Sequence, residues 1–269
     1  MLLSPDNALR MVGTGPRTLV LVHGFGDDMS AFSGLLTTGV ADQFRLLLVD
    51  LPGFGSRPAR DGVLSIAKHG RFLAELIIRA CPGSSVGLVG HSVGSMIAVE
   101  AIRHLGRGAA GLFSIEGNLT RHDLYFTGKA ASHSDPAALK SAFLKELDQL
   151  AQGDPTLARY RQAVDGADPR SLWELALDTI RTSEALAPGE PLRALGVSCL
   201  YYWNPENTNP ETAIWIRERG LANRTIAGAS HWPMIDDASR VAAELTAFFN
   251  EVYGTPGGRR RPKTRSDDF

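Results

Sequence analysis

Cysteines are scarce in this sequence, and nucleotide-binding loops are missing from it. Its 269 residues include two cysteines, Cys81 and Cys199. Two are too few for a disulfide-dense scaffold or a structural zinc site. We therefore expect both cysteines to be small buried core residues of a protein in a reducing compartment. None of the glycine clusters gives the G-x-x-x-x-G-K pattern of a phosphate loop. The sequence therefore predicts neither a metal nor a cofactor.

Charge imbalance and long apolar runs are also missing. The 28 Lys and Arg residues against 29 Asp and Glu leave a net charge of −1, which gives no general attraction to nucleic acid or anionic lipid. No stretch approaches the roughly 18 apolar residues that a membrane helix needs, and residues 1–10 lack the apolar run of a signal peptide. We expect a soluble cytoplasmic protein with a small-molecule substrate and no nucleic-acid or membrane partner; its oligomeric state stays open.

The sequence does contain a regular alternation of strand-like and helical segments. Unbroken apolar runs lie at residues 18–22, 45–49, 86–89 and 111–115. Such runs indicate strands that are buried on both faces, as in parallel sheets. Helical patterns at residues 65–80 and 93–105 separate the later runs. We expect an α/β fold, with a mostly parallel sheet flanked by helices and ligands bound beyond the carboxyl ends of the strands.

The middle of the chain has helical patterns but no strand patterns. Asp135-Pro136 and Asp168-Pro169 are good helix starts, and strand patterns resume at residues 197–202 and 223–227. We therefore expect a core formed by residues 1–117 and 191–253, into which a helical cap at 118–190 is inserted. Residues 254–269 are rich in glycine and then in arginine, and we expect a disordered basic tail there.

The strongest chemical signal is the pentapeptide at residues 90–94, which matches G-x-S-x-G. It lies directly between a predicted buried strand and a predicted helix, which is the context that the motif requires. The sharp turn needs small residues on both sides of Ser92, and Gly90 and Gly94 supply them. Ser92 is therefore the candidate nucleophile. The helix that follows directs its positive end at an oxygen that develops negative charge.

A serine hydroxyl needs an adjacent base near neutral pH, and His231 is the best candidate. It follows a predicted strand and a Gly-Ala-Ser turn at residues 228–230. This order places His231 at the carboxyl edge of the same sheet. The remaining histidines lie on predicted helices, in the cap, or in the turns at His23 and His91.

Four motifs together resemble the α/β-hydrolase superfamily, in the same order. They are His-Gly-Phe-Gly at residues 23–26, Asp-Leu-Pro-Gly-Phe-Gly-Ser at 50–56, the serine turn, and Ser-His-Trp-Pro at 230–233. The resemblance implies that the backbone N–H groups of Phe25 and Val93 form an oxyanion hole. It also implies that Asp50 belongs to a structural turn rather than to the catalytic residues.

The acidic member of the triad departs from the family pattern. The loop after residues 197–203, where most relatives carry an aspartate, contains Glu206 but no aspartate. The alternative is Glu116, at the end of the strand that follows the nucleophile helix. Some members of the superfamily carry their acid at that strand end, and a glutamate that ends a buried strand needs a partner. We favour Glu116 and keep Glu206 as the alternative acid.

The combination predicts a serine hydrolase that acts on a small to medium carboxylic ester, thioester or lactone through an acyl-enzyme. A serine at position 92 argues against the alkyl-enzyme chemistry of haloalkane dehalogenases and epoxide hydrolases. Carbon–carbon bond or amide hydrolysis, and a non-catalytic ligand receptor on the same scaffold, are the alternatives. Candidate pocket-lining residues are Leu124, Tyr125, Phe126, Trp173, Leu177 and Trp232.

Overall fold

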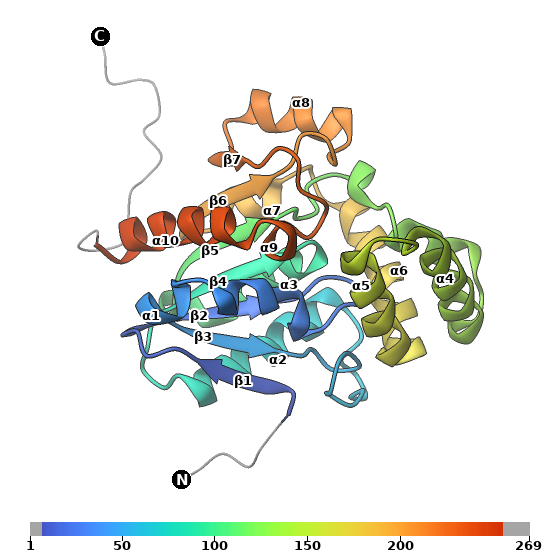
Figure 1. The fold of residues 1–269 in the computed structure, drawn as a ribbon, viewed down its shortest axis with the longest axis horizontal. Coiled ribbons are helices and arrows are strands. Elements are labelled where there is room, and N and C mark those ends of the chain that lie inside the picture. Colours follow the sequence, from blue (N-terminus) through green and yellow to red (C-terminus); the bar gives the residue numbers. More distant parts are fainter. Residues whose placement is uncertain (1–6, 255–269) are drawn as a thin grey trace.

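A seven-stranded sheet forms the centre of the molecule (Figure 1). The computed structural model describes residues 7–254, so the predicted basic tail lies outside the described residues except for Gly254. The strand order is β1-β3-β2-β4-β5-β6-β7. Bounds of the strands are Leu9–Val12 (β1), Arg17–Val22 (β2), Phe44–Val49 (β3), Val86–His91 (β4), Ala109–Ile115 (β5), Ser198–Trp203 (β6) and Asn223–Thr225 (β7).

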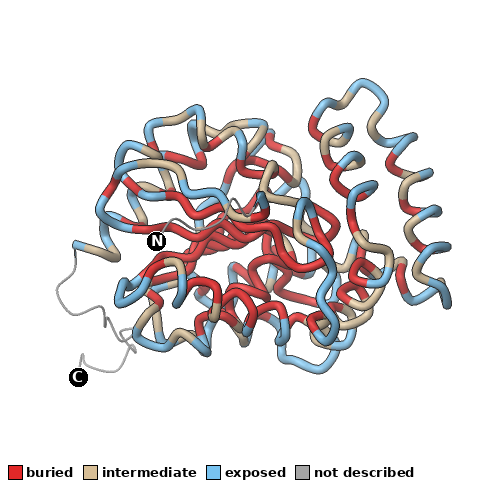
Figure 2. The backbone as a smooth tube through the Cα atoms, turned by 90° about the horizontal axis from the view of Figure 1, so that it is seen from below, coloured by how far each residue is buried: buried red, intermediate tan, exposed pale blue. Residues whose placement is uncertain are grey.

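The sheet is parallel except at one edge, which confirms the predicted fold class. β1 pairs antiparallel with β3, and the other five pairings are parallel. All six residues of β4 are buried, as are the last five of β2. Figure 2 shows these buried strands in the middle of the molecule, with helices on both sides. Both faces are covered, which explains why the strands read as unbroken apolar runs.

Helices cover the sheet and fill the insertion. The helices of the core are α1 (Val40–Gln43), α2 (Ile66–Ala80), α3 (Val93–Leu105), α8 (Pro210–Arg219), α9 (Pro233–Asp236) and α10 (Ala238–Gly254). Those between β5 and β6 are α4 (Pro136–Leu150), α5 (Pro155–Gly166), α6 (Pro169–Ala185) and α7 (Glu190–Arg193). Short 3₁₀ helices are η1 (Met29–Thr37), η2 (Gly106–Gly108), η3 (Arg121–Asp123) and η4 (Thr127–Ser132).

Three helices of the insertion begin in the same way. Asp135, Asp154 and Asp168 each accept a hydrogen bond from a backbone N–H of the first turn, and each is followed by proline. An aspartate N-cap satisfies a helix donor that has no partner within the helix, and proline at the next position lacks the N–H that would need one. The sequence analysis used two of these signals but did not predict α5, although Asp154-Pro155 carries the third.

The strand β1 and the helix α8 were also not predicted. β1 is a four-residue edge strand with no fully buried residue, so it lacks the apolar run that marks the other strands. α8 buries Thr212, Ala213 and Ile216, which is a weak apolar stripe. Among the helices of residues 7–254, none is long and apolar enough to cross a bilayer.

One buried histidine has a consequence for stability. His69 on α2 is fully buried, its ring lies 6.1 Å from that of Phe54, and neither ring nitrogen has a hydrogen-bond partner among the described residues. Burial lowers the pKa of His69 to about 3. In the unfolded chain this histidine binds a proton near pH 6.5, whereas in the folded chain it stays neutral at that pH. The free energy of unfolding therefore falls as the pH drops below about 6.5.

We predict that His69→Leu makes the protein less sensitive to acid. Between pH 8 and pH 5, wild type should lose about 2 kcal/mol of unfolding free energy through this histidine, and His69→Leu should not. Above pH 7 the histidine should add no pH dependence to either protein. Urea unfolding of both proteins between pH 8 and pH 5 measures it. The matched control is His104→Leu, at an exposed position on α3. Parallel pH dependences of His69→Leu and wild type would contradict the prediction.

Candidate active site

The predicted nucleophile turn joins β4 to α3 and holds Ser92 at a positive φ, with φ 51° and ψ −128°. Close packing enforces the turn. A Cβ at Gly94 would lie 2.4 Å from the carbonyl oxygens of Val22 and His23, and a Cβ at Gly90 would lie 2.6 Å from the Cα of Ser95. The requirement for small residues two positions before and after the serine is therefore steric, as the motif predicts.

Hydrogen bonds to β5 and within the turn hold the same turn in place. The backbone N–H of Ser92 donates to the carbonyl oxygen of Ile115 at 2.9 Å, which continues the β4–β5 pairing past the end of the strand. The Ser95 hydroxyl donates to the Gly90 carbonyl oxygen at 2.9 Å, and the Ser114 hydroxyl donates to the Ser95 oxygen at 2.9 Å. The serine oxygen therefore projects from a rigid base rather than from a mobile loop.

Glu116 and His231 meet beside the nucleophile turn. The Nδ1 of His231 lies 3.5 Å from the Oε2 of Glu116, a separation of the kind that closes further when a substrate binds. The carboxylate is only 5% exposed, and its Oε1 accepts a hydrogen bond from the backbone N–H of Asn204. The backbone N–H of Glu116 in turn donates to the carbonyl oxygen of Tyr202 at 2.9 Å. The carboxylate is thus held on one oxygen and presents the other to the imidazole.

Backbone strain is concentrated at this point. Within residues 7–254, Ser92 and Glu116 are the two non-glycine residues with positive φ, at 51° and 49°. Such conformations cost of order 1–3 kcal/mol each and cluster at functional sites. Ser92 and Glu116 directly follow the adjacent strands β4 and β5, and both line the same cavity.

The alternative acid, Glu206, points elsewhere. It is exposed, and its carboxylate accepts a hydrogen bond from the backbone N–H of Gly228 at 3.2 Å. Asn204 and Asn207 donate from their amide groups to the carbonyl oxygen of Ala229. The loop after β6 therefore supports the backbone that leads to His231, and in this structure the carboxylate beside His231 is that of Glu116.

His91 holds the backbone of His231, a role that was not predicted from the sequence. Its Nε2 lies 2.8 Å from the carbonyl oxygen of His231, and the two rings are 4.8 Å apart. Burial lowers the pKa of His91 well below its ordinary value, so the ring is neutral. Because a carbonyl oxygen accepts, the proton of His91 belongs on Nε2.

The loop after β2 places the Phe25 amide at the site. The carbonyl oxygen of Gly24 accepts from the Nδ1 of His23 at 2.9 Å and from the N–H of Asp27 at 3.3 Å. In a trans peptide the N–H points away from the carbonyl, so fixing this oxygen also fixes the direction of the Phe25 N–H. A Cβ at Gly24 would lie 3.0 Å from the Cβ of Ser92, which shows how close the loop lies to Ser92.

Asp50 lies outside this arrangement. One of its carboxylate oxygens accepts from the N–H of Met29 and the other from the N–H of Ser56, both at 2.8 Å. The side chain therefore fastens the turn after β3 to the loop after β2.

A cavity of about 450 Å³ lies over these residues. Ser92, His231, Glu116, Phe25 and Val93 all line it. Of the six predicted pocket residues, Tyr125, Phe126 and Trp232 line the cavity, and Leu124, Trp173 and Leu177 do not. Trp173 donates from its indole N–H to the carbonyl oxygen of His133 instead. Further lining residues, from the loops after β5 and β6, are polar: Asn118, His122, Asp123, Thr127, Asn207, Thr208 and Asn209.

Comparison with known proteins gives one family and one recurring relative. The family model described as "Alpha/beta hydrolase family" matches residues 19–244. The pimeloyl-[acyl-carrier protein] methyl ester esterase of Stenotrophomonas maltophilia is 28% identical over 93% of this chain and 99% of its own length. The enzyme of the same name from Sodalis glossinidius is 36% identical, but the match covers 38% of this chain and 37% of that protein.

Solved structures show the same fold. A thermophilic esterase from Thermogutta terrifontis superposes with a TM-score of 0.69 at 21% identity, covering 91% of this chain and 93% of its own.

We predict that Glu116→Gln slows the reaction of Ser92 with a fluorophosphonate by at least about a hundredfold. A glutamine accepts the Asn204 N–H but cannot stabilise an imidazolium as a carboxylate does. The rate of covalent labelling, followed by mass spectrometry, measures the effect. The matched control is Glu206→Gln, which should react within about twofold of wild type. The reverse pattern, a slow Glu206→Gln and a normal Glu116→Gln, would assign the acid to the loop after β6.

Proposed function

This chain belongs to the alpha/beta hydrolase family, and from that premise we propose that it is a serine hydrolase for a small to medium carboxylic ester, thioester or lactone. The observation that carries the proposal is that Ser92, Glu116 and His231 line one cavity, with the Glu116 carboxylate beside His231 and with Ser92 and Glu116 both at positive φ. We propose Ser92 as the nucleophile, His231 as the base and Glu116 as the acid that supports it.

The proposed reaction has two stages. Ser92 Oγ attacks the carbonyl carbon while His231 takes its proton, and the oxyanion accepts hydrogen bonds from the N–H groups of Phe25 and Val93. His231 then gives the proton to the leaving alcohol oxygen, which departs and leaves an acyl-enzyme. In the second stage His231 takes a proton from water, the hydroxide attacks the acyl carbon, and Ser92 leaves with that proton. Glu116 stabilises the imidazolium in both stages.

The position of Glu116 favours an enzyme over the receptor alternative. The missing aspartate after β6 is the feature that argued for a degenerate site. A buried carboxylate beside His231, fixed by the Asn204 N–H, supplies the group from the neighbouring strand. The receptor hypothesis then has no remaining support in the site residues.

The cavity and the relatives together favour a methyl or other small alkyl ester as the scissile group. A volume of about 450 Å³ suits an acyl chain of moderate length. The Stenotrophomonas maltophilia relative is named for a methyl ester substrate, and we carry only the methyl ester to this chain. Phe25, Phe126, Tyr160 and Trp232 provide aromatic lining for an apolar chain.

We propose that residues 118–190 form a cap over the core of residues 1–117 and 191–253. Between β5 and β6 the described chain forms helices, of which α4, α5 and α6 lie together to the right of the sheet in Figure 1. Tyr125, Phe126 and Tyr160 extend from this insertion into the cavity lining. Both cysteines are free thiols, which supports the cytoplasm as the proposed compartment.

We predict that the protein hydrolyses p-nitrophenyl butyrate and that Ser92→Ala lowers kcat/KM by at least about a thousandfold, since the variant lacks the hydroxyl that forms the proposed acyl-enzyme. Release of p-nitrophenol measures the rate. The matched control is Ser84→Ala, at an exposed turn before β4, which should match wild type. Equal turnover by Ser92→Ala and wild type would remove the proposed nucleophile.

The charge of the cavity gives a prediction about substrate. Asp27, Glu116 and Asp123 line it, Asp27 is already paired with Arg159, and among the described lining residues there is no lysine or arginine that could pair with a substrate carboxylate. A substrate carboxylate would lose its hydration next to acidic side chains. We expect dimethyl adipate to be cleaved with a kcat/KM at least about tenfold above that of monomethyl adipate, and methyl hexanoate to resemble the diester. Equal rates for both adipate esters would contradict this view of the cavity.

A further inference from the structure

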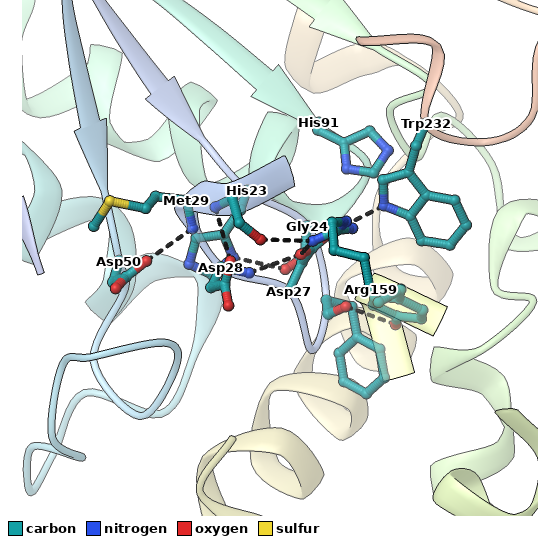
Figure 3. Close-up of polar contacts among 12 residues, drawn as sticks. His23, Gly24, Asp27, Asp28, Met29, Asp50, His91, Arg159 and Trp232 are labelled. Carbon is teal, nitrogen blue, oxygen red and sulfur yellow. Dashed lines mark hydrogen bonds and ion pairs between the residues drawn. The ribbon is translucent and has the colours of Figure 1, made fainter. Parts of the chain in front are cut away.

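A buried carboxylate outside the proposed triad joins three segments of the site (Figure 3). Asp27 is 1% exposed and lies two residues past Phe25, in the loop after β2. Its carboxylate accepts hydrogen bonds from the backbone N–H of Asp28 at 2.8 Å and from the indole N–H of Trp232 at 2.9 Å. Trp232 follows His231 directly. Asp27 therefore ties the loop that carries the Phe25 amide to the loop that carries the base.

The third segment is helix α5 of the insertion. Arg159 binds both oxygens of Asp27, at 2.6 and 2.9 Å, and also donates to the hydroxyl of Ser30 at 3.0 Å. Burial alone would lower the pKa of the Arg159 guanidinium, but the hydrogen bonds and charge of Asp27 outweigh it and raise that pKa above its ordinary value. The pair is a two-point, charge-assisted contact, which fixes direction as well as distance.

The next residue of α5 reaches the same loop at a second point. The hydroxyl of Tyr160 donates to the carbonyl oxygen of Phe25 at 2.8 Å, and burial raises the pKa of Tyr160 well above its usual value. The tyrosine ring also lies 4.7 Å from that of Trp232. Two adjacent residues of one cap helix therefore hold the loop on both sides of Gly26.

We propose that Arg159 is a positioning residue through which cap helix α5 fixes the oxyanion loop and, by way of Asp27 and Trp232, the loop of His231. This inference rests on the proposed function, because it assigns Arg159 a part in the same reaction. The guanidinium touches Asp27 rather than the reacting atoms. Its contribution is to hold the Phe25 N–H and the His231 imidazole in the correct positions relative to Ser92. These relative positions matter most in the transition state, where the oxyanion and the imidazolium exist.

The same helix provides a matched control. Arg161 lies two residues further along α5 and pairs with Asp148 and Asp165, at the surface and away from the cavity lining. Arg159 and Arg161 are thus two arginines of one helix, each with acidic partners, and only the first is tied to the site. Exposed pairs like that of Arg161 contribute little to stability.

The first test replaces each arginine and measures kcat and KM for p-nitrophenyl butyrate, with thermal unfolding as a check on folding. Arg159→Met should lower kcat at least about tenfold and change KM less than threefold, because the loss falls on the transition state rather than on substrate binding. Arg159→Lys should restore part of kcat, and Arg161→Met should stay within about twofold of wild type. Equal losses in Arg159→Met and Arg161→Met would overturn the proposal.

A double variant separates positioning from folding. Arg159→Met alone leaves the buried Asp27 carboxylate with one partner fewer, which destabilises the fold in its own right. Asp27→Asn combined with Arg159→Met removes both charges; the amide oxygen can still accept from Trp232, while the backbone N–H of Asp28 loses its acceptor. This variant should unfold near the wild-type temperature and still show the lowered kcat. A kcat equal to that of wild type would overturn the proposal.

Failure of the proposed function gives a different result. If wild type does not turn over the ester, the proposed ester hydrolysis fails while the inference is still tested by the rate at which a fluorophosphonate labels Ser92 in the same variants. Slower labelling of Arg159→Met than of Arg161→Met supports the positioning role, and equal rates overturn it.

Discussion

The left-handed backbone at Ser92 is the constraint on which the rest of the site depends. A serine adopts this conformation at a cost of order 1–3 kcal/mol, and the structure sustains it by packing α3 against the end of β2. Gly94 lets the helix approach the carbonyl oxygens of Val22 and His23, and the Ser92 N–H is held by Ile115. Because β2 and β5 lie on either side of β4 and contact the turn that follows it, the backbone of Ser92 is fixed, and the other groups of the site are placed with respect to it.

Glu116 shows how a parallel sheet can place a carboxylate beside His231 from the end of β5 instead of from the loop after β6. β5 and β6 are neighbours and run in the same direction, so residues just past their ends lie side by side. Asn204 follows β6 and donates its backbone N–H to Glu116, which follows β5. The first residue of the loop after β6 thus holds the proposed acid, which follows the neighbouring strand β5. The Glu116 carboxylate lies 3.5 Å from the Nδ1 of His231, and the backbone that directs it there has a positive φ.

The insertion contributes more to the site than a cover. Arg159 and Tyr160 of α5 reach the loop after β2, and Trp232 links that loop to His231. In the proposed function, this places the oxyanion donors and the base under the control of one helix that lies outside the sheet. A cap that is fastened to both loops also couples the shape of the cavity to the geometry of the reacting groups, so changes in cap sequence are expected to alter rate as well as specificity.

The sequence by itself determined the layered α/β fold, six of the seven strands and the sharp turn at Ser92, and it led to the prediction of His231 as the base, because each depends on a pattern of neighbouring residues: apolar runs, helix starts, glycines on both sides of a serine. It also offered Glu116, since a carboxylate that ends a buried strand must have a partner. Only the tertiary structure decided that His231 and Asn204 are those partners, that Glu206 turns away, and that Arg159 holds Asp27. These contacts join residues up to 132 positions apart, and a polar pair of that kind leaves no periodic trace in either segment. It exists only once the sheet and the cap have brought the two side chains together.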